Sequence, residues 1–201
     1  GDWRNPEEVV VDDLALARRL LATIDNLPAQ TGYALKPSVY LYGFSRGAQL
    51  AHRFTFFYPE RVERVVALSA GTYTLPLRQL DVNCEGRTQS LKLPYGVGDM
   101  GKRLGRPLSR TKLRHVDFWI GVGGADNRAG DVPRSWDSVM GPTRVERARQ
   151  FQSALQTVGV QSTLTIYPGV GHEISPLMRA SAIAFLRADS VKKPISRAPL
   201  Y

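Results

Sequence analysis

A chain of 201 residues with 43% hydrophobic and 22% charged residues can form one globular domain with its own core. No apolar run approaches the roughly 20 residues that cross a bilayer, and the start, GDWRNPEEVV, lacks the basic and apolar regions of a signal peptide. We therefore expect no membrane contact, and a location either in the cytoplasm or outside the cell after removal of a signal.

The first predicted element is a helix. Asn5 is suited to cap it, Pro6 to occupy its first position, and the two glutamates that follow complement the positive end of the helix dipole. Apolar residues then recur at helical spacing up to about Leu27, and Pro28 is expected to end the helix.

Strands and helices alternate after this point. Short apolar runs predict buried strands at 38–42, 64–71, 115–124 and 162–169. Amphipathic patterns predict helices at 47–58, 143–159 and 175–188. This alternation is typical of an α/β fold with a parallel sheet covered by helices on both faces. We expect a single domain over residues 1–188, followed by a loose basic tail at 189–201.

The connection at 72–114 is long, punctuated by Gly and Pro, and strongly basic. Much of the net charge of +9 lies here, in Arg78, Arg87, Lys92, Lys102, Arg103, Arg106, Arg110, Lys112 and Arg114. A basic region can bind nucleic acid or an anionic surface. No aromatic-interleaved or helix-turn-helix pattern accompanies it, so we expect no nucleic-acid partner.

The segment SVYLYGFSRGAQLAHRF, residues 38–54, places Ser45 between two glycines where a strand becomes a helix. A tight strand-to-helix turn exposes the hydroxyl but strains the backbone, so the residues two before and two after it, Gly43 and Gly47, are expected to be small to avoid collision. The helix dipole and the backbone N–H of Arg46 are then aimed at the site, where they can stabilise an oxyanion. Ser45 is the candidate nucleophile.

A base and an acid complete such a site. Of the three histidines, His52 lies inside a predicted helix and His115 at the start of a strand, which favours structural roles. His172 follows the last strand in a glycine-bracketed loop, at the edge of the sheet where catalytic groups gather. Asp126 follows the preceding strand directly and is the first candidate for the acid that orients the imidazole, with Asp131 as its rival.

The order Ser45, Asp126, His172 and the segments YGFSRGAQLAHRF, YPERVERVVALSAG, GVGGADNRAGDVP and YPGVGHE resemble the α/β-hydrolase superfamily. The likeness is to its bacterial esterases and polyhydroxyalkanoate-depolymerase-like members, and it covers most of the chain. It implies Ser45 as nucleophile, His172 as general base and acid, Asp126 as its orienter and the Arg46 N–H as an oxyanion donor. It also implies a lid-like insertion at 72–114 and, more weakly, Trp136 as a substrate-contacting residue.

The front of the chain departs from this family. The nucleophile there follows the fifth strand of a sheet of about eight, whereas only one helix and its entry loop precede residue 38. We therefore expect the C-terminal part of the fold, without the first four strands or the loop that donates a second oxyanion N–H. Strand 38–42 would then be an exposed apolar edge, able to pair with the missing N-terminal strands or with a second chain.

These features predict a serine esterase acting on a small-molecule carboxylic ester. The alternative is a catalytically inert fragment, or a binding or assembly module, that keeps the three side chains without a complete oxyanion hole. No cofactor is expected: the histidines lack metal-ligand spacing, Cys84 is the single cysteine, and no nucleotide loop is present.

Overall fold

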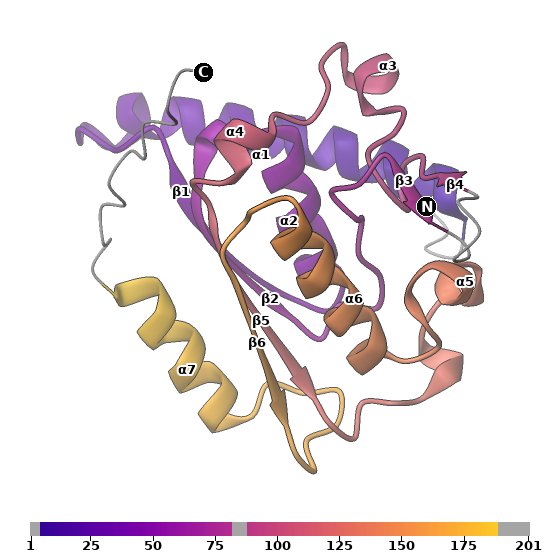
Figure 1. Cartoon of the computed structure of the whole chain (residues 1–201). Coiled ribbons are helices and arrows are strands. Elements are labelled where there is room, and N and C mark those ends of the chain that lie inside the picture. Colours follow the sequence, from indigo (N-terminus) through magenta and orange to yellow (C-terminus); the bar gives the residue numbers. More distant parts are fainter. Residues whose placement is uncertain (1–4, 82–87, 189–201) are drawn as a thin grey trace, which may run out of the picture.

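The computed structural model describes residues 5–81 and 88–188. Its centre is a four-stranded parallel sheet in the order β1-β2-β5-β6 (Figure 1), which confirms the predicted α/β class. A two-stranded antiparallel ribbon of β3 and β4 lies apart from it. The strands are β1 (Val39–Phe44), β2 (Val62–Leu68), β3 (Gln79–Asp81), β4 (Thr88–Ser90), β5 (Asp117–Gly123) and β6 (Ser162–Tyr167).

Helices cover both faces of the sheet unequally. The helices are α1 (Pro6–Thr31), α2 (Arg46–Phe57), α3 (Met100–Leu104), α4 (Arg110–Leu113), α5 (Asp137–Met140), α6 (Arg144–Thr157) and α7 (Pro176–Arg187). Short 3-10 turns lie at Pro59–Arg61, Ala129–Asp131 and Arg134–Trp136. Figure 1 shows α2 and α6 on one side of the sheet and α7 on the other.

The hydrophobic core reflects this division. The larger cluster joins α1, α2, α6 and the connection between β2 and β5 to the sheet, and Phe54, Phe56 and Phe151 are among its fully buried members. The smaller cluster lies under α7, where Trp119 and Tyr167 meet Met178. The four helices that the sequence predicted, α1, α2, α6 and α7, each bury apolar residues in one of these clusters, which is how most helical stability arises in a folded domain.

The first helix begins as expected and ends later than expected. The Asn5 side chain accepts a hydrogen bond from the Glu7 N–H, and Pro6 is the first helical residue. The helix continues past Pro28 to Thr31, so the predicted end at this proline is wrong. Proline removes one donor and crowds the carbonyl one turn earlier, yet the helix runs one more turn and ends at Gly32, which adopts a left-handed conformation, with φ of 74°, and donates its N–H to the Pro28 carbonyl.

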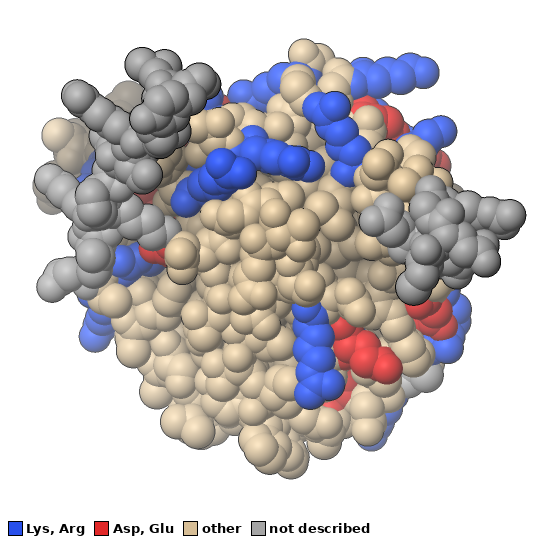
Figure 2. Space-filling view, viewed as in Figure 1, with Lys and Arg blue, Asp and Glu red and all other residues tan. Residues whose placement is uncertain are grey.

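The segment at 72–114 carries the chain from the end of β2 back to the start of β5. Leu91, Leu93, Val97 and Met100 are buried in the main core, so its described part is an integral layer of the domain. On the face seen in Figure 2, Lys and Arg side chains gather over the region of α3 and α4, and the lower part of that face is largely uncharged. Cys84 and the predicted tail at 189–201 lie outside the described residues.

Parallel strands place all their carboxyl ends at one edge of the sheet. The register aligns Phe44 with Leu68, and Gly123 with Tyr167. The turns that carry Ser45, Asp126 and His172 therefore leave the sheet at the same edge. Among the described residues, no helix is long and apolar enough to cross a membrane.

Candidate active site

Ser45 occupies a strained turn between β1 and α2. Its φ of 52° and ψ of −117° are rare for a residue with a side chain. The turn is held by the Ser45 N–H, which donates to the Leu68 carbonyl at 2.8 Å, and by the Ser45 carbonyl, which accepts from the Ala48 and Gln49 N–H groups. A fixed unfavourable backbone conformation of this kind is the local geometry of a nucleophile elbow.

The two glycines that flank Ser45 differ in how much space a side chain would have at each position. A Cβ on Gly43 would lie 2.3 Å from the Gly47 carbonyl oxygen, so only glycine fits at the end of β1. A Cβ on Gly47 would meet nothing within 4 Å. The expectation that both positions must be small holds for Gly43 and is corrected for Gly47, because the first turn of α2 directs that position into open space.

His172 lies beside the serine, in the loop after β6. Its Nε2 is 3.0 Å from the Ser45 Oγ, and its ring packs 4.8 Å from the ring of Phe44, centroid to centroid. The loop is pressed onto β5, since a Cβ on Gly123 would lie 2.3 Å from the Val170 carbonyl oxygen. The imidazole is thus placed by backbone packing between the ends of two strands.

Asp126 lies on the other side of the imidazole. Its Oδ2 is 2.7 Å from the His172 Nδ1, and the residue is only 3% exposed. A carboxylate can only accept, so Nδ1 carries the proton and Nε2 is left to accept from the Ser45 hydroxyl. Asp131, the rival candidate, is exposed, and its main-chain carbonyl accepts from Arg144.

Arg46 provides the candidate oxyanion donor. It is the first residue of α2, where a backbone N–H has no carbonyl one turn earlier to bind. Its side chain turns to α1 and pairs with the buried Asp13 at 2.6 Å, while Arg53 binds the other oxygen of the same carboxylate. This ion-pair network fixes the start of α2 against α1.

Two cavities open beside these groups. A cavity of about 380 Å³ is lined by Ser45, Arg46, Gln49, Gly71, Asp131, Pro133 and Arg144. A second, of about 250 Å³, lies on the far side of the imidazole and is lined by Ala125, Asp126, Arg128, Asp131, Gly171 and His172. No described residue of 72–114 lines either cavity, and the lid role of that segment remains a prediction.

Trp136 does not line the cavity, which corrects the expectation that it contacts substrate. The residue is fully buried, its indole N–H donates to the Tyr73 carbonyl at 3.2 Å, and its ring packs on Tyr95 at 4.5 Å. An indole buried with its donor satisfied acts as core.

His52 and His115 lie away from the serine hydroxyl. His52 is fully buried in α2, with its Nδ1 2.9 Å from the Ala48 carbonyl and its Nε2 2.9 Å from the Thr74 N–H. Burial, with a smaller contribution from the neighbouring Arg53, holds the pKa of His52 well below its ordinary value. His115 is exposed, two residues before β5 begins.

Sequence reasoning missed Gln49 and Arg144 at this site. Gln49 lies one helical turn after Ser45, a spacing that returns to the same face of α2 and could have been recognised. Arg144 begins α6, and its Nη1 lies 2.7 Å from the Asp126 Oδ1. Nothing in the local sequence indicates that contact, which joins residues 18 positions apart across a loop.

No family model and no curated protein matches the chain. Among solved structures, the poly(3-hydroxybutyrate) depolymerase LpqC from Bordetella parapertussis is 27% identical with a TM-score of 0.59, and the match covers 88% of this chain and 59% of that one. Esterase PE8 is 24% identical, with a TM-score of 0.51 and coverage of 87% and 62%. SOBER1 from Arabidopsis thaliana is 15% identical, with a TM-score of 0.50 and coverage of 90% and 64%.

This chain thus spans less than two thirds of the length of each of these structures. The two lower identities bear on the fold alone, and that fold is the parallel sheet described above. The chain thus shares the α/β-hydrolase fold with these structures.

Proposed function

We propose that the protein is a serine hydrolase that cleaves small carboxylic esters through an acyl-enzyme on Ser45. One observation carries the proposal: a continuous hydrogen-bond chain runs from the Ser45 Oγ through His172 to the Asp126 carboxylate, with contacts of 3.0 and 2.7 Å. These distances are within the range in which a general base takes a proton from a hydroxyl.

The reaction follows from these positions. The Ser45 Oγ attacks the ester carbonyl while the His172 Nε2 takes its proton, and Asp126 stabilises the imidazolium that forms. The carbonyl oxygen becomes an oxyanion, which the Arg46 N–H stabilises. The imidazolium then protonates the leaving alkoxy group, and the alcohol departs. In the second half, His172 activates a water molecule that attacks the acyl-enzyme, and the acid is released with Ser45 restored.

The similar structures give independent support for a hydrolase. LpqC is a poly(3-hydroxybutyrate) depolymerase, and at 27% identity its match extends over 88% of this chain. Poly(3-hydroxybutyrate) is a polyester, so the activity in the name of LpqC belongs to the same chemical class as the proposed ester hydrolysis. The cavity of about 380 Å³ at Ser45 has the volume of a small-molecule site.

A second candidate is an inert or binding module that keeps the three side chains. The observation that favours it is coverage: the chain matches only 59% of LpqC. In the described residues, we assign one oxyanion donor, the Arg46 N–H. Loss of one such donor lowers turnover by roughly 10²–10³-fold in a comparable enzyme.

Two measurements separate the candidates. First, a fluorophosphonate probe is expected to label the wild-type protein at Ser45, identified by peptide mass spectrometry, and to leave Ser45→Ala unlabelled. Second, hydrolysis of p-nitrophenyl acetate is expected to fall by roughly 10³-fold or more in Ser45→Ala, as for other catalytic serines.

The matched control is Ser153→Ala, which makes the same change at an exposed position of α6. It is expected to keep the wild-type rate and labelling. Folded wild-type protein that hydrolyses the ester no faster than Ser45→Ala would refute the enzyme and support the inert module.

A further inference from the structure

The Asp126 carboxylate is held from two sides. Its Oδ2 faces the His172 Nδ1 at 2.7 Å, and its Oδ1 accepts from the Arg144 Nη1, also at 2.7 Å. The side chains of Asp126 and Arg144 are 1% and 5% exposed. A buried carboxylate needs a charged or hydrogen-bonding partner to stay ionised, and here the guanidinium supplies it on the oxygen that the imidazole does not use.

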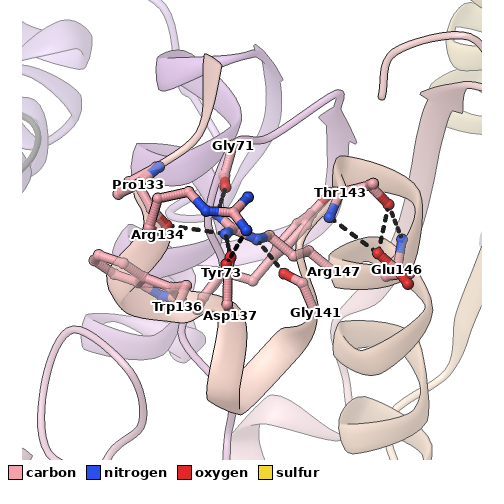
Figure 3. A network of polar contacts seen from close by, with 10 residues as sticks. All are labelled: Gly71, Tyr73, Pro133, Arg134, Trp136, Asp137, Gly141, Thr143, Glu146 and Arg147. Atoms are coloured by element: carbon pink, nitrogen blue, oxygen red, sulfur yellow. Dashed lines mark hydrogen bonds and ion pairs between the residues drawn. The ribbon is translucent and has the colours of Figure 1, made fainter. Parts of the chain in front are cut away.

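The position of Arg144 is poor for helix stability. It is the first residue of α6, where the helix dipole favours negative rather than positive charge. The backbone there is nevertheless fixed, because Thr143 and Glu146 form a capping box with both reciprocal hydrogen bonds present (Figure 3). The cap therefore anchors the arginine at a place where its charge serves Asp126 rather than the helix.

Arg144 also ties the acid to the loop that follows it. Its Nη2 donates to the Asp131 carbonyl at 3.1 Å, so one guanidinium spans the turn after β5 and the wall of the cavity at Ser45. Its planar fork allows both contacts at once, which an ammonium cannot reproduce.

A second arginine, one turn later on α6, fixes the rest of the same loop. Figure 3 shows the Arg147 guanidinium among the carbonyls of Gly71, Pro133 and Gly141 and the Asp137 carboxylate, at 2.6 to 2.9 Å. Gly71 and Pro133 line the cavity at Ser45. The loop that carries Asp126 is thus bound to α6 at two places, and of these two arginines it is Arg144 that contacts the Asp126 carboxylate.

We propose that Arg144 is a positioning residue for the site, which acts through Asp126 on the orientation and protonation of His172. This inference rests on the proposed function. Arg144 fixes which carboxylate oxygen faces the imidazole, and it places a positive charge next to that carboxylate.

Other charged groups in the described part of the chain also lie around His172. Asp131 and Arg128 line the cavity beside the imidazole, Glu173 follows it in the chain, and Arg46 begins the helix next to Ser45. All four are at least partly exposed, so solvent screens them more than it screens Arg144. Removal of Arg144 should therefore change the electrostatics of His172 most.

The test compares Arg144→Gln, Arg144→Lys and the control Arg149→Gln, which removes the same charge from an exposed position of α6. With p-nitrophenyl acetate, Arg144→Gln is expected to lower kcat by about 10- to 100-fold, the scale of a displaced catalytic group. KM should change less. The acid limb of the pH–kcat/KM profile should move to higher pH, because a cation that opposes the imidazolium is gone.

Arg144→Lys keeps the charge and one donor, so it is expected to retain the wild-type pH profile with a smaller loss of kcat. It also covers the case in which the glutamine variant does not fold. Arg149→Gln should match wild type. A shift of the acid limb to lower pH in Arg144→Gln would contradict the inference. A wild-type profile in Arg144→Gln would overturn it.

A spectroscopic reading keeps this inference separate from the proposed function. The His172 Nδ1 proton, bound to Asp126, should give a downfield proton resonance that disappears in His172→Gln. We expect Arg144→Gln to shift or broaden that resonance, and Arg149→Gln to leave it in place. If the wild-type protein proves inactive, the proposed function fails, and the resonance still decides whether Arg144 positions Asp126. An unchanged resonance in Arg144→Gln would overturn the positioning role even in an active enzyme.

Discussion

Gly43 and Gly47 flank the same serine, and only at Gly43 would a side chain collide with the backbone. Replacing Gly43 with alanine forces a Cβ to within 2.3 Å of the Gly47 carbonyl oxygen, and backbone cannot move aside as a flexible side chain can. We expect Gly43→Ala to lower the free energy of unfolding by at least about 3 kcal/mol, the upper range for overpacked sites. Urea denaturation followed by circular dichroism measures this change.

Gly47→Ala is the matched comparison. Its Cβ would lie in open space at the second residue of α2, where alanine favours the helix by roughly 0.5–1 kcal/mol over glycine. The two variants are therefore expected to change stability in opposite directions. Equal losses in both would show that the turn tolerates no side chain at either position and would contradict the steric account.

His52 makes a second residue-scale prediction, on pH. Its pKa is lowered well below the ordinary 6.5 by burial, so the folded protein keeps it neutral while the unfolded chain takes up a proton below that pH. Stability is thus fully present above about pH 6.5 and is lost as the pH falls toward the folded-state pKa, by up to about 1.4 kcal/mol per pH unit.

The check is urea unfolding at pH 7.5 and 5.5 for wild type, His52→Gln and the exposed-site control His115→Gln. Wild type and His115→Gln are expected to lose on the order of 1 kcal/mol more than His52→Gln between these pH values. His52→Gln should be less stable at pH 7.5, because the hydrogen bonds to Ala48 and Thr74 are altered. The same pH dependence in all three proteins would refute the assignment.

At the scale of elements, the sequence pattern predicted the sheet because buried strands and amphipathic helices leave local signals. Each predicted strand of the main sheet lies within a few residues of an observed one, as β5 shows at Asp117–Gly123 against the predicted 115–124. The predicted end of α1 was wrong because a proline disfavours a helix without always ending it, and Gly32, in its left-handed conformation, is the observed C-cap. The ribbon of β3 and β4 has three residues a strand, too few for a periodic pattern.

Some features of the candidate site could likewise be predicted from the sequence, and others could not. The turn at Ser45 and the loop of His172 are local features next to strands, so their meeting at one edge follows from a parallel sheet. The contacts of Arg144 and the burial of Trp136 depend on how the loop after β5 packs against α6 and the connection after β2. Such contacts join distant segments through irregular backbone, and no local periodicity encodes them.

At the scale of the whole molecule, most of the large exposed apolar side chains come from the first quarter of the chain. Six of the eight large exposed hydrophobic side chains among the described residues precede Phe44: Val11, Leu16, Tyr33, Leu35, Tyr40 and Tyr42. They belong to α1, the link after it and β1, which is an edge of the sheet with pairing to β2 alone in the described chain. An open strand beside apolar side chains is a template for pairing with another strand.

We propose that the free edge of β1 pairs with a further strand, from N-terminal strands of a longer chain or from a second chain. For the 201-residue chain by itself, this edge should cause self-association that increases with protein concentration. Tyr40→Lys with Tyr42→Lys places two positive charges on the edge strand, where each side chain is now 44% exposed, and is expected to reduce the association. Light scattering coupled to size-exclusion chromatography over a range of concentrations measures the mass.

The control for that experiment is Leu177→Lys with Ile183→Lys, which adds the same two positive charges at exposed apolar residues of α7 rather than of β1. It should associate as wild type does. Monomeric wild-type protein at every concentration, or an equal effect of the α7 control, would contradict pairing at this edge. If the wild type associates and only the β1 variant reduces the association, the contact lies on β1. The charges added on α7 raise the general repulsion between molecules by a similar amount, so repulsion alone would affect both variants.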